Sequence, residues 1–539
     1  METNLKFIII TFFFPLVLIG QSRGYEIEKI VNDYLPPNGP GVAIIATQNQ
    51  KKLYENAFGL SNISNGEKVQ ADDLFRIGSI TKQFTAAAIL KLAHEDRLRL
   101  EDPIEKYIPN ATMAENISIK QLLQHTSGLG NQSDVAAFKV DSIDLNNYPE
   151  NIIQPILDSP SKFSPGTDYA YSNLGYIILG YIIERVTDMP YEIYLKIAFF
   201  QPLGMNYTGF EYIDDNILSN SKGYSLVNGK FEEAVPLNMK IAYSAGGLVS
   251  SLQDLDKWNR AVMAGKVLPS SYVGRIQETS TLPNGKATGY SLGWQIGNIQ
   301  GLKTVRHDGI VNGFTSMAIY VPEADIFVTT LSNCDCFRDI ELLASRITAL
   351  LADRPFPTQS IKLSKDELEK FQGKYNHDNS EMILAAHDST LMYYRSGGEK
   401  KTLIPVDPNS FGIEGTLDQI RFSKGDKSSY TLRSLSGNTH WERTEIVTAY
   451  NFLLLDDKKL EEYVGKYRVP NAFVFDVIKV GDKLYGQIGN DRKEILCYDT
   501  DKFCARYTDA LLQFSRDQEG KVVKLILTFD RAFTAERME

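Results

Sequence analysis

The chain has 539 residues, of which 43% are hydrophobic and 23% are charged. This is the composition of a globular protein with two to four domains. The formal net charge of −10, which no long basic run offsets, argues against a nucleic-acid partner.

The N-terminus has the features of an export signal. Lys6 precedes an apolar run over residues 7–20, which is short for a membrane span and typical of the hydrophobic part of a signal peptide. We therefore predict a signal peptide over residues 1–24 and a periplasmic or secreted mature protein with no stable membrane insertion. An uncleaved anchor is the alternative interpretation of the same run.

Residues 25–354 combine strand-like segments at both ends with a helical middle. Apolar runs predict two β-hairpins, one formed by residues 41–46 with 52–58 and one by residues 315–321 with 326–332. Apolar spacing predicts three helices, over residues 79–98, 174–186 and 340–351. This order predicts an α+β fold, in which one antiparallel sheet is flanked by helices.

The pattern of the sequence changes after the linker-like residues 354–357. Short alternating strands with Gly, Asn and Asp turns predominate, and the segment 368–375 (LEKFQGKY) matches 460–467 (LEEYVGKY), 92 residues further on. We therefore predict two small all-β, barrel-like domains, over residues 358–445 and 446–539.

The four cysteines fall in two close pairs. Cys334 and Cys336 follow a strand-like run, and Cys497 and Cys504 flank a possible hairpin. In an exported protein a disulfide between Cys497 and Cys504 is geometrically possible. Because no histidine cluster accompanies either pair, we expect no metal site.

Ser79 and Lys82 form the first element of a catalytic site. Their spacing places both side chains on one face of a helix, where an amine can help to deprotonate a hydroxyl. The same spacing occurs at Ser159 and Ser219, each with its own lysine, but only Ser79 follows a strand-like segment and opens a periodic helix. A helix-capping serine is the structural alternative.

Two further motifs follow along the chain. Tyr171 lies two residues before Asn173, a pair that offers a general base and an amide able to hold a substrate amide. His307 and Gly309 precede a predicted strand, where glycine allows the close backbone approach that a substrate cleft needs. Alone, each motif also suits an ordinary structural tyrosine or a surface histidine.

Taken in chain order, the three motifs resemble those of the penicillin-recognising serine hydrolases: class C β-lactamases, DD-peptidases, related esterases and D-aminopeptidases. The resemblance covers roughly residues 25–353 and implies a β-lactamase/transpeptidase-like fold. Three segments look like framework segments of that family, at 122–129 (LLQHTSGL), 244–248 (SAGGL) and 290–294 (YSLGW). Some D-aminopeptidases of the family also carry appended β-barrel domains.

The resemblance implies a role for each residue. Ser79 would be acylated, and Lys82 and Tyr171 would share the proton transfers, with Tyr171 also activating the deacylating water. Asn173 would contact the substrate amide, and the backbone N–H groups of Ser79 and Ile310 would form the oxyanion hole. No metal or organic cofactor is implied.

One departure from the family pattern concerns the substrate. His307 stands where the β-lactamases carry the lysine of Lys-Thr-Gly, which weakens the fixed positive charge for a substrate carboxylate, although Asp308 would raise the His307 pKa. The expected function is therefore that of a peptidase or amidase on D-amino-acid or short peptide substrates. A carboxylesterase or weak β-lactamase is the alternative within the family. A non-catalytic penicillin- or peptidoglycan-binding protein is the alternative from another class.

Overall fold

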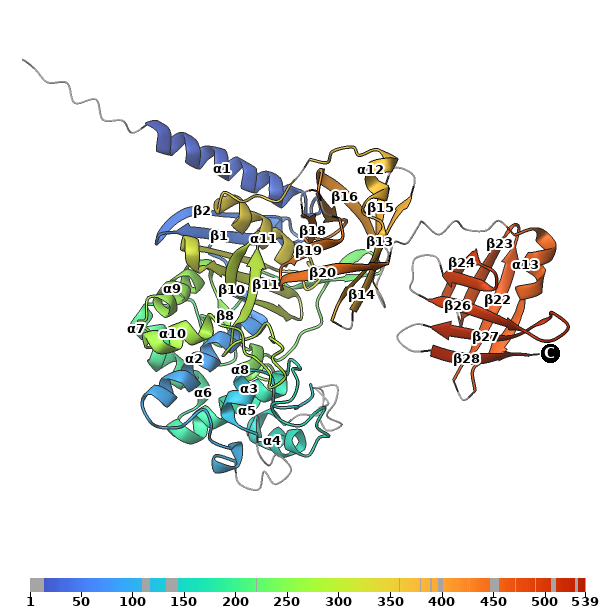
Figure 1. Ribbon diagram of the computed structural model, residues 1–539. Helices are drawn as coiled ribbons and strands as arrows, with labels where there is room; N and C mark the ends of the chain where they lie inside the picture. The colour runs from blue at the N-terminus through green and yellow to red at the C-terminus, as the bar shows by residue number, and fades with distance from the viewer. Residues whose placement is uncertain are drawn as a thin grey trace, which may run out of the picture. The chain divides into compact units, whose positions relative to one another are not determined.

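The computed structural model describes residues 14–108, 117–131, 144–219, 221–357 and, with gaps at 379, 388–389, 396–400, 424, 426, 446–454, 471, 490, 506–509 and 529–531, residues 359–538. The chain divides into two compact units, Met1–Phe356 and Pro357–Glu539 (Figure 1). The first part of the predicted export signal, residues 1–13, lies outside the described residues. In the part of the chain that is described, no helix combines the length and apolar character needed to cross a membrane.

An antiparallel sheet forms the centre of the first unit, in the order β2-β1-β12-β11-β10-β9. Its strands are β1 (Val42–Gln48), β2 (Lys51–Phe58), β9 (Gln295–Ile299), β10 (Leu302–Val311), β11 (Phe314–Val321) and β12 (Ile326–Ser332). Smaller pairs are β3 (Leu60–Asn62) with β4 (Glu67–Lys68), β5 (Phe75–Arg76) with β8 (Val249–Ser250), and β6 (Tyr224–Val227) with β7 (Lys230–Glu233). Both predicted hairpins therefore form and pair through β1 and β12.

Helices flank this sheet, as Figure 1 shows. They are α1 (Phe14–Asn32), α2 (Thr81–His94), α3 (Ile119–Leu123), α4 (Glu150–Leu157), α5 (Asn173–Thr187), α6 (Tyr191–Leu195), α7 (Gln201–Leu203), α8 (Tyr243–Gly246), α9 (Leu252–Met263), α10 (Ser270–Ile276) and α11 (Ile340–Leu351). Together, sheet and helices confirm the predicted α+β, β-lactamase/transpeptidase-like fold.

The alternation of side chains along the strands separates the two faces of the sheet. Ala43, Ile45 and Ala318 belong to the large core shared with α2 and α5. His307 pairs with Ala318 in the register of β10 and β11, so His307 lies on this face. Arg306 lies on the opposite face, where it forms an ion pair with Glu341 of α11. The register thus directs His307, but not its neighbours, toward the helical core.

The helix predicted over residues 79–98 is shorter than expected. A 3-10 turn (Gly78–Ile80) comes first, α2 begins at Thr81, and it ends at His94. Ser79 therefore lies in a tight turn before the helix. The residues at the N-caps of the turn and of α2 are Ile77 and Ile80, so the Ser79 side chain caps neither of them.

Two closed barrels make up the second unit. The first contains β13 (Gly373–His377), β14 (Ser380–His387), β15 (Thr390–Arg395), β16 (Lys401–Asp407), β17 (Ser410–Ile413), β18 (Gln419–Phe422), β19 (Ser429–Ser434) and β20 (Gly437–Glu445). The second contains β21 (Gly465–Arg468), β22 (Val474–Val480), β23 (Lys483–Ile488), β24 (Asp491–Asp499), β25 (Lys502–Ala505), β26 (Leu511–Arg516), β27 (Val522–Thr528) and β28 (Ala532–Arg537). The predicted barrel-like domains are confirmed.

The sequence repeat reappears as a repeated contact. Each barrel follows a short helix, α12 (Lys365–Glu369) or α13 (Asp457–Tyr463). The hydroxyl of Tyr375 donates to the carbonyl of Phe371 at 2.9 Å, and the hydroxyl of Tyr467 donates to the carbonyl of Tyr463 at 2.8 Å. In both copies a buried tyrosine thus ties the first strand to the end of the preceding helix.

The disulfide that forms is not the one that the sequence made possible. A disulfide joins Cys334 to Cys336, whereas none joins Cys497 to Cys504. In the register of β24 and β25, Cys504 pairs with Leu496, the neighbour of Cys497. Because adjacent side chains in a strand point to opposite faces, Cys497 and Cys504 lie on opposite sides of the barrel wall.

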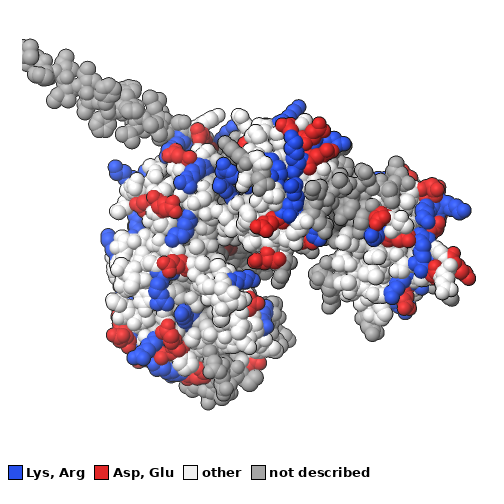
Figure 2. Space-filling model, viewed as in Figure 1, with Lys and Arg blue, Asp and Glu red and all other residues white. Residues whose placement is uncertain are grey.

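Charged side chains are mixed over the visible surface. On the face drawn in Figure 2, basic and acidic residues lie interspersed rather than in one patch of a single sign. This distribution agrees with the absence of a basic run in the sequence.

Candidate active site

The Ser79 turn places its hydroxyl at the surface of a closely packed core. Gly78 and Ile80 are buried, whereas Ser79 between them is partly exposed. Gly78 has a φ of +49°, a left-handed conformation that glycine adopts without strain. The backbone therefore turns sharply and presents one accessible hydroxyl.

Lys82 is fully buried next to this hydroxyl. Its Nζ lies 2.9 Å from Ser79 Oγ, 2.8 Å from Asn173 Oδ1 and 2.7 Å from the carbonyl oxygen of Ala245. These three groups come from the 3-10 turn, α5 and α8. The amine thus joins three elements that are distant in sequence.

The protonation state of Lys82 follows from its burial and its partners. Burial lowers the pKa of Lys82 to about 7, against an opposing effect of the Asp308 charge. A neutral amine has two N–H donors and one lone pair. The oxygens of Asn173 and Ala245 can only accept, so they take both donors. With those two donors occupied, Lys82 Nζ also lies 2.9 Å from Ser79 Oγ, close enough for a neutral amine to exchange a proton with the hydroxyl.

Tyr171 stands over the same amine. Its ring centre lies 4.9 Å from Lys82 Nζ, and the Ser79 side chain is close enough to influence its hydroxyl. Burial raises the pKa of Tyr171 well above its ordinary value, which outweighs the opposite effect of the Ser79 side chain. Tyr171, which the sequence offers as a general base, is therefore not easier to deprotonate here, and its hydroxyl stays neutral.

Hydrogen bonds from the segment 125–131 fix the backbone around Tyr171. His125 Nδ1 accepts the backbone N–H of Ser172 at 3.1 Å, and Asn131 both accepts the N–H of Asn173 and donates to the carbonyl of Tyr171. The His125 ring lies 4.3 Å from that of Tyr171, centre to centre. In the sequence, His125 lies in a framework segment and neither His125 nor Asn131 belongs to a catalytic pattern, so the sequence does not predict this support.

His307 is buried and uncharged. Its Nε2 lies 2.9 Å from the Tyr290 hydroxyl, and its Nδ1 donates to the Asp308 carbonyl at 2.6 Å. Burial lowers the pKa of His307 to about 4, although the Asp308 charge acts in the opposite direction. The expected partial restoration of positive charge by Asp308 is therefore outweighed. At neutral pH this position supplies no cation to a substrate.

The edge of β10 runs directly behind the Ser79 turn. A methyl group on Gly309 would lie 2.1 Å from the Ile77 carbonyl oxygen and 3.0 Å from the Ser79 nitrogen. A methyl group on Gly78 would lie 2.9 Å from the Ile310 nitrogen. Only glycine at both positions allows this approach, which brings the Ser79 and Ile310 backbone nitrogens to one place.

All the residues predicted for the site therefore meet in one region. The two other serine–lysine pairs do not: the Ser159 hydroxyl donates to the Ile156 carbonyl, and the Ser219 hydroxyl donates to the Leu74 and Ser221 carbonyls. Among the described residues, no cluster of three or more His, Cys, Asp and Glu side chains is arranged to hold a metal ion.

The fold and the site together define a serine hydrolase of the β-lactamase and transpeptidase type. Residues 30–349, more than half of the chain, match the Beta-lactamase family model. The chain therefore belongs to that family. Residues 454–539, which contain the second barrel, match a domain of unknown function, DUF3471.

Individual relatives are distant. The chain is 29% identical over 325 residues to Protein flp of Staphylococcus aureus (strain N315), a match that covers 57% of this chain and 62% of that protein. It therefore spans less than two thirds of this relative. Two solved structures are also similar.

The first is an octameric penicillin-binding protein homologue from Pyrococcus abyssi (TM-score 0.55, 24% identity, 79% of this chain and 99% of that chain). The second is a D-stereospecific amidohydrolase from Streptomyces sp. (TM-score 0.51, 26% identity, 58% of this chain and 94% of that chain).

The Lys82 pKa predicts the pH dependence of acylation. The neutral amine is the base, so the rate of Ser79 labelling by a fluorophosphonate should fall about tenfold per pH unit below pH 7 and level off above it. Asn173→Asp places a carboxylate beside Nζ, which raises the Lys82 pKa and should move this limb to higher pH. A rate independent of pH between 5 and 9 in both enzymes would contradict the assignment.

The contact between Gly309 and the Ser79 turn predicts a second effect. Gly309→Ala should reduce acylation at least about a hundredfold, because the added methyl group separates the two backbone nitrogens. Gly274→Ala is the matched control: this glycine lies in α10, and an added methyl group meets no atom within 4 Å. Unchanged labelling of the Gly309 variant would show that the close approach is dispensable.

Proposed function

We propose that this chain is an exported peptidase or amidase that acts on D-amino-acid or short peptide substrates through an acyl-enzyme on Ser79. The observation that carries the proposal is the position of Lys82 Nζ, which lies 2.9 Å from Ser79 Oγ and is held there by Asn173 and Ala245.

The reaction begins when Lys82 takes the Ser79 proton and Ser79 Oγ attacks the substrate carbonyl carbon. The resulting oxyanion accepts hydrogen bonds from the backbone N–H groups of Ser79 and Ile310. The proton on Lys82 then reaches the leaving amine through the Tyr171 hydroxyl, and the C–N bond breaks. In deacylation, a water molecule attacks the ester carbonyl carbon, the bond from that carbon to Ser79 Oγ breaks, and the proton of the water passes through Tyr171 and Lys82 to Ser79 Oγ.

The proposed substrate preference rests on the charge state of His307 and on the Asn173 side chain. A neutral His307 provides no fixed charge for the carboxylate that a β-lactam carries, which favours amide substrates without that group. Asn173 Oδ1 accepts from Lys82 Nζ, which places this amide side chain beside the nucleophile, where it would contact the substrate amide. The D-stereospecific amidohydrolase among the similar structures supports the same substrate class.

Labelling and turnover test the activity. A fluorophosphonate should label Ser79 in the wild-type chain and not in Ser79→Ala, as mapped by mass spectrometry. Release of p-nitroaniline from a D-Ala anilide should exceed, in kcat/KM, both hydrolysis of a nitrophenyl acetate and opening of a chromogenic cephalosporin. A higher value for the acetate would make the chain an esterase. Labelling by a fluorescent penicillin with no turnover of any substrate would make it a binder.

Export rests on Lys6 and the apolar run that follows it. When the full-length gene is expressed in a bacterium, the mature chain should appear in the periplasm or medium with an N-terminus near residue 25. An intact N-terminus that sediments with the membrane would instead indicate an uncleaved anchor.

A further inference from the structure

The turn that accepts from Lys82 is too short to keep its shape alone. α8 spans only Tyr243–Gly246, and one turn of helix is not stable by itself. Tyr243 at its start is buried with a φ of +41°, a left-handed conformation that bulky residues rarely adopt. Contacts from outside the turn must therefore hold the Ala245 carbonyl in front of Lys82.

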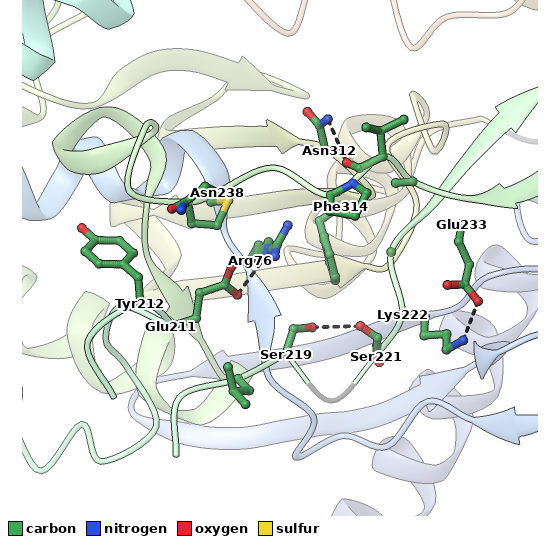
Figure 3. Close-up of a pocket in the computed structure, with 16 residues that line it drawn as sticks. Arg76, Glu211, Tyr212, Ser219, Ser221, Lys222, Glu233, Asn238, Asn312 and Phe314 are labelled. Carbon is green, nitrogen blue, oxygen red and sulfur yellow. Dashed lines mark hydrogen bonds and ion pairs between the residues drawn. The ribbon is translucent and has the colours of Figure 1, made fainter. Parts of the chain in front are cut away.

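The segment that leads into α8 borders open space. Asn238 and Met239 line a cavity of about 530 Å³ on the first unit, and the lining also includes Val235, which is 75% exposed. Figure 3 shows Asn238 at the wall of this cavity. From this segment, the Met239 carbonyl accepts the N–H of Tyr243 at 3.2 Å. Further support comes from α2 and α5, which pack against α8.

Hydroxyl groups tie both of these helices to α8. Ser244 Oγ donates to the Tyr176 carbonyl of α5 at 2.8 Å, and Gly180 makes room for it, since a methyl group there would lie 2.2 Å from Oγ. In α2, Thr81 Oγ1 accepts the backbone N–H of Leu248 at 3.2 Å. The same two helices carry the buried amine and its side-chain acceptor, so α8 is fixed in a common frame with both.

Thr85 makes the contact nearest to the amine. It follows Lys82 by three residues in α2, which places the two side chains on one face of the helix. Thr85 Oγ1 lies 2.6 Å from the Ser244 carbonyl oxygen, and Lys82 Nζ lies 2.7 Å from the next carbonyl oxygen, that of Ala245. The two side chains therefore hold successive carbonyls of one turn.

The acceptors determine the order of this hydrogen-bond chain. A carbonyl can only accept, so the Thr85 hydroxyl gives its one hydrogen to Ser244, which is closer than the Thr81 carbonyl at 3.4 Å. The Tyr191 hydroxyl lies 2.6 Å from Thr85 Oγ1 and is therefore the donor in that contact. Burial raises the pKa of Tyr191 well above its ordinary value, so this donor stays protonated.

Tyr191 is itself fixed at its backbone and its ring. Its backbone N–H donates to Glu184 Oε1 at 2.9 Å, and its ring lies 5.0 Å from that of Tyr243, centre to centre. Tyr191 thus packs on the residue with the left-handed backbone and also orients the hydroxyl that binds the following carbonyl.

We propose that Thr85 and Tyr191 are positioning residues for the base: Tyr191 orients the Thr85 hydroxyl, which fixes α8 and keeps its next carbonyl within reach of Lys82. Both act through α8 rather than on the reacting atoms. The inference rests on the proposed function in one respect, the role of Lys82 as the base for Ser79. If the hydroxyl only satisfied a buried carbonyl, its loss would change folding stability alone.

Replacing the hydroxyl tests this role. In Thr85→Val the Ser244 carbonyl loses its donor, so α8 should shift and withdraw the Ala245 carbonyl from Lys82 Nζ. Hydrogen bonds to the charged form of an amine raise its pKa, so this withdrawal should lower the Lys82 pKa. We expect the plateau rate of Ser79 labelling by a fluorophosphonate to fall about tenfold and the acidic limb to move down by about half a pH unit.

Further variants identify the cause of the change. Thr85→Ser keeps the hydroxyl and should restore the plateau rate to within about twofold of the wild type. Tyr191→Phe removes the donor to Thr85 and should lower the plateau about threefold. Tyr194→Phe, on the same helix, is the matched control, because the Tyr194 hydroxyl has no hydrogen-bond partner among the described residues. Val235→Trp changes the cavity side and should leave the limb in place.

The other titratable groups near Lys82 are the same in all these variants. They are Tyr171, Tyr176, His125, His307 and Asp308. A limb that moves in Thr85→Val therefore reports the position of α8 rather than a new charge. A lower melting temperature with unchanged limb and plateau would overturn the proposal, as would a Thr85→Ser variant that behaves like Thr85→Val.

Alkylation of a Ser79→Cys variant separates this inference from the proposed activity. Iodoacetamide reacts with the thiolate, which the neighbouring Lys82 ammonium stabilises, so the rate reports Lys82 without any acyl-enzyme. Adding Thr85→Val should slow the reaction about twofold at pH 7, because a shift of half a pH unit removes about half of the ammonium. Mass spectrometry of the peptide that contains residue 79 keeps the free Cys497 and Cys504 out of this readout.

The two failures are then distinguishable. If a fluorophosphonate does not label Ser79 in the wild type, the proposed function fails, and the alkylation rate still decides the role of Thr85. Equal alkylation rates with and without Thr85→Val would overturn that role.

Discussion

A buried amine determines the organisation of this catalytic centre. Removing an ammonium group from water is costly, and the protein offsets that cost by lowering the pKa of Lys82 and by giving its N–H groups two fixed acceptors. The acceptors come from α5 and α8, while Lys82 itself comes from α2. The same contacts that orient the base therefore hold the three helices in register around the nucleophile turn.

The protonation states of the neighbouring groups depend on the same burial. Tyr171 and His307 both remain neutral because the burial that shifts the Lys82 pKa also disfavours a phenolate and an imidazolium beside it. The centre thus holds its proton-transferring groups without a fixed charge. Above pH 7, where Lys82 is mainly neutral, charge would develop there in the proposed reaction, when Lys82 accepts the Ser79 proton.

The sequence was sufficient for the two hairpins and three of the helices of the first unit, and it singled out the residues that the structure brings together. Periodicity located α5 and the hairpins within a few residues, and the spacing of Ser79 and Lys82 on a tight turn is a local property. The directions of the pKa shifts of Tyr171 and His307 were not accessible, because they depend on burial by segments far away in the chain. The same holds for His125, whose contact with Ser172 spans 47 residues. It holds also for the cysteines, since strand register decided that Cys497 and Cys504 face apart.

The close approach of Gly309 to the Ser79 turn also bears on how such an enzyme can diversify. A side chain at Gly309 would collide with the backbone of Ile77, so substitutions at this position would disturb the nucleophile turn. Exposed positions such as Val235 meet no such restriction. Related proteins with this scaffold are therefore expected to differ in substrate preference while sharing the geometry of acyl transfer.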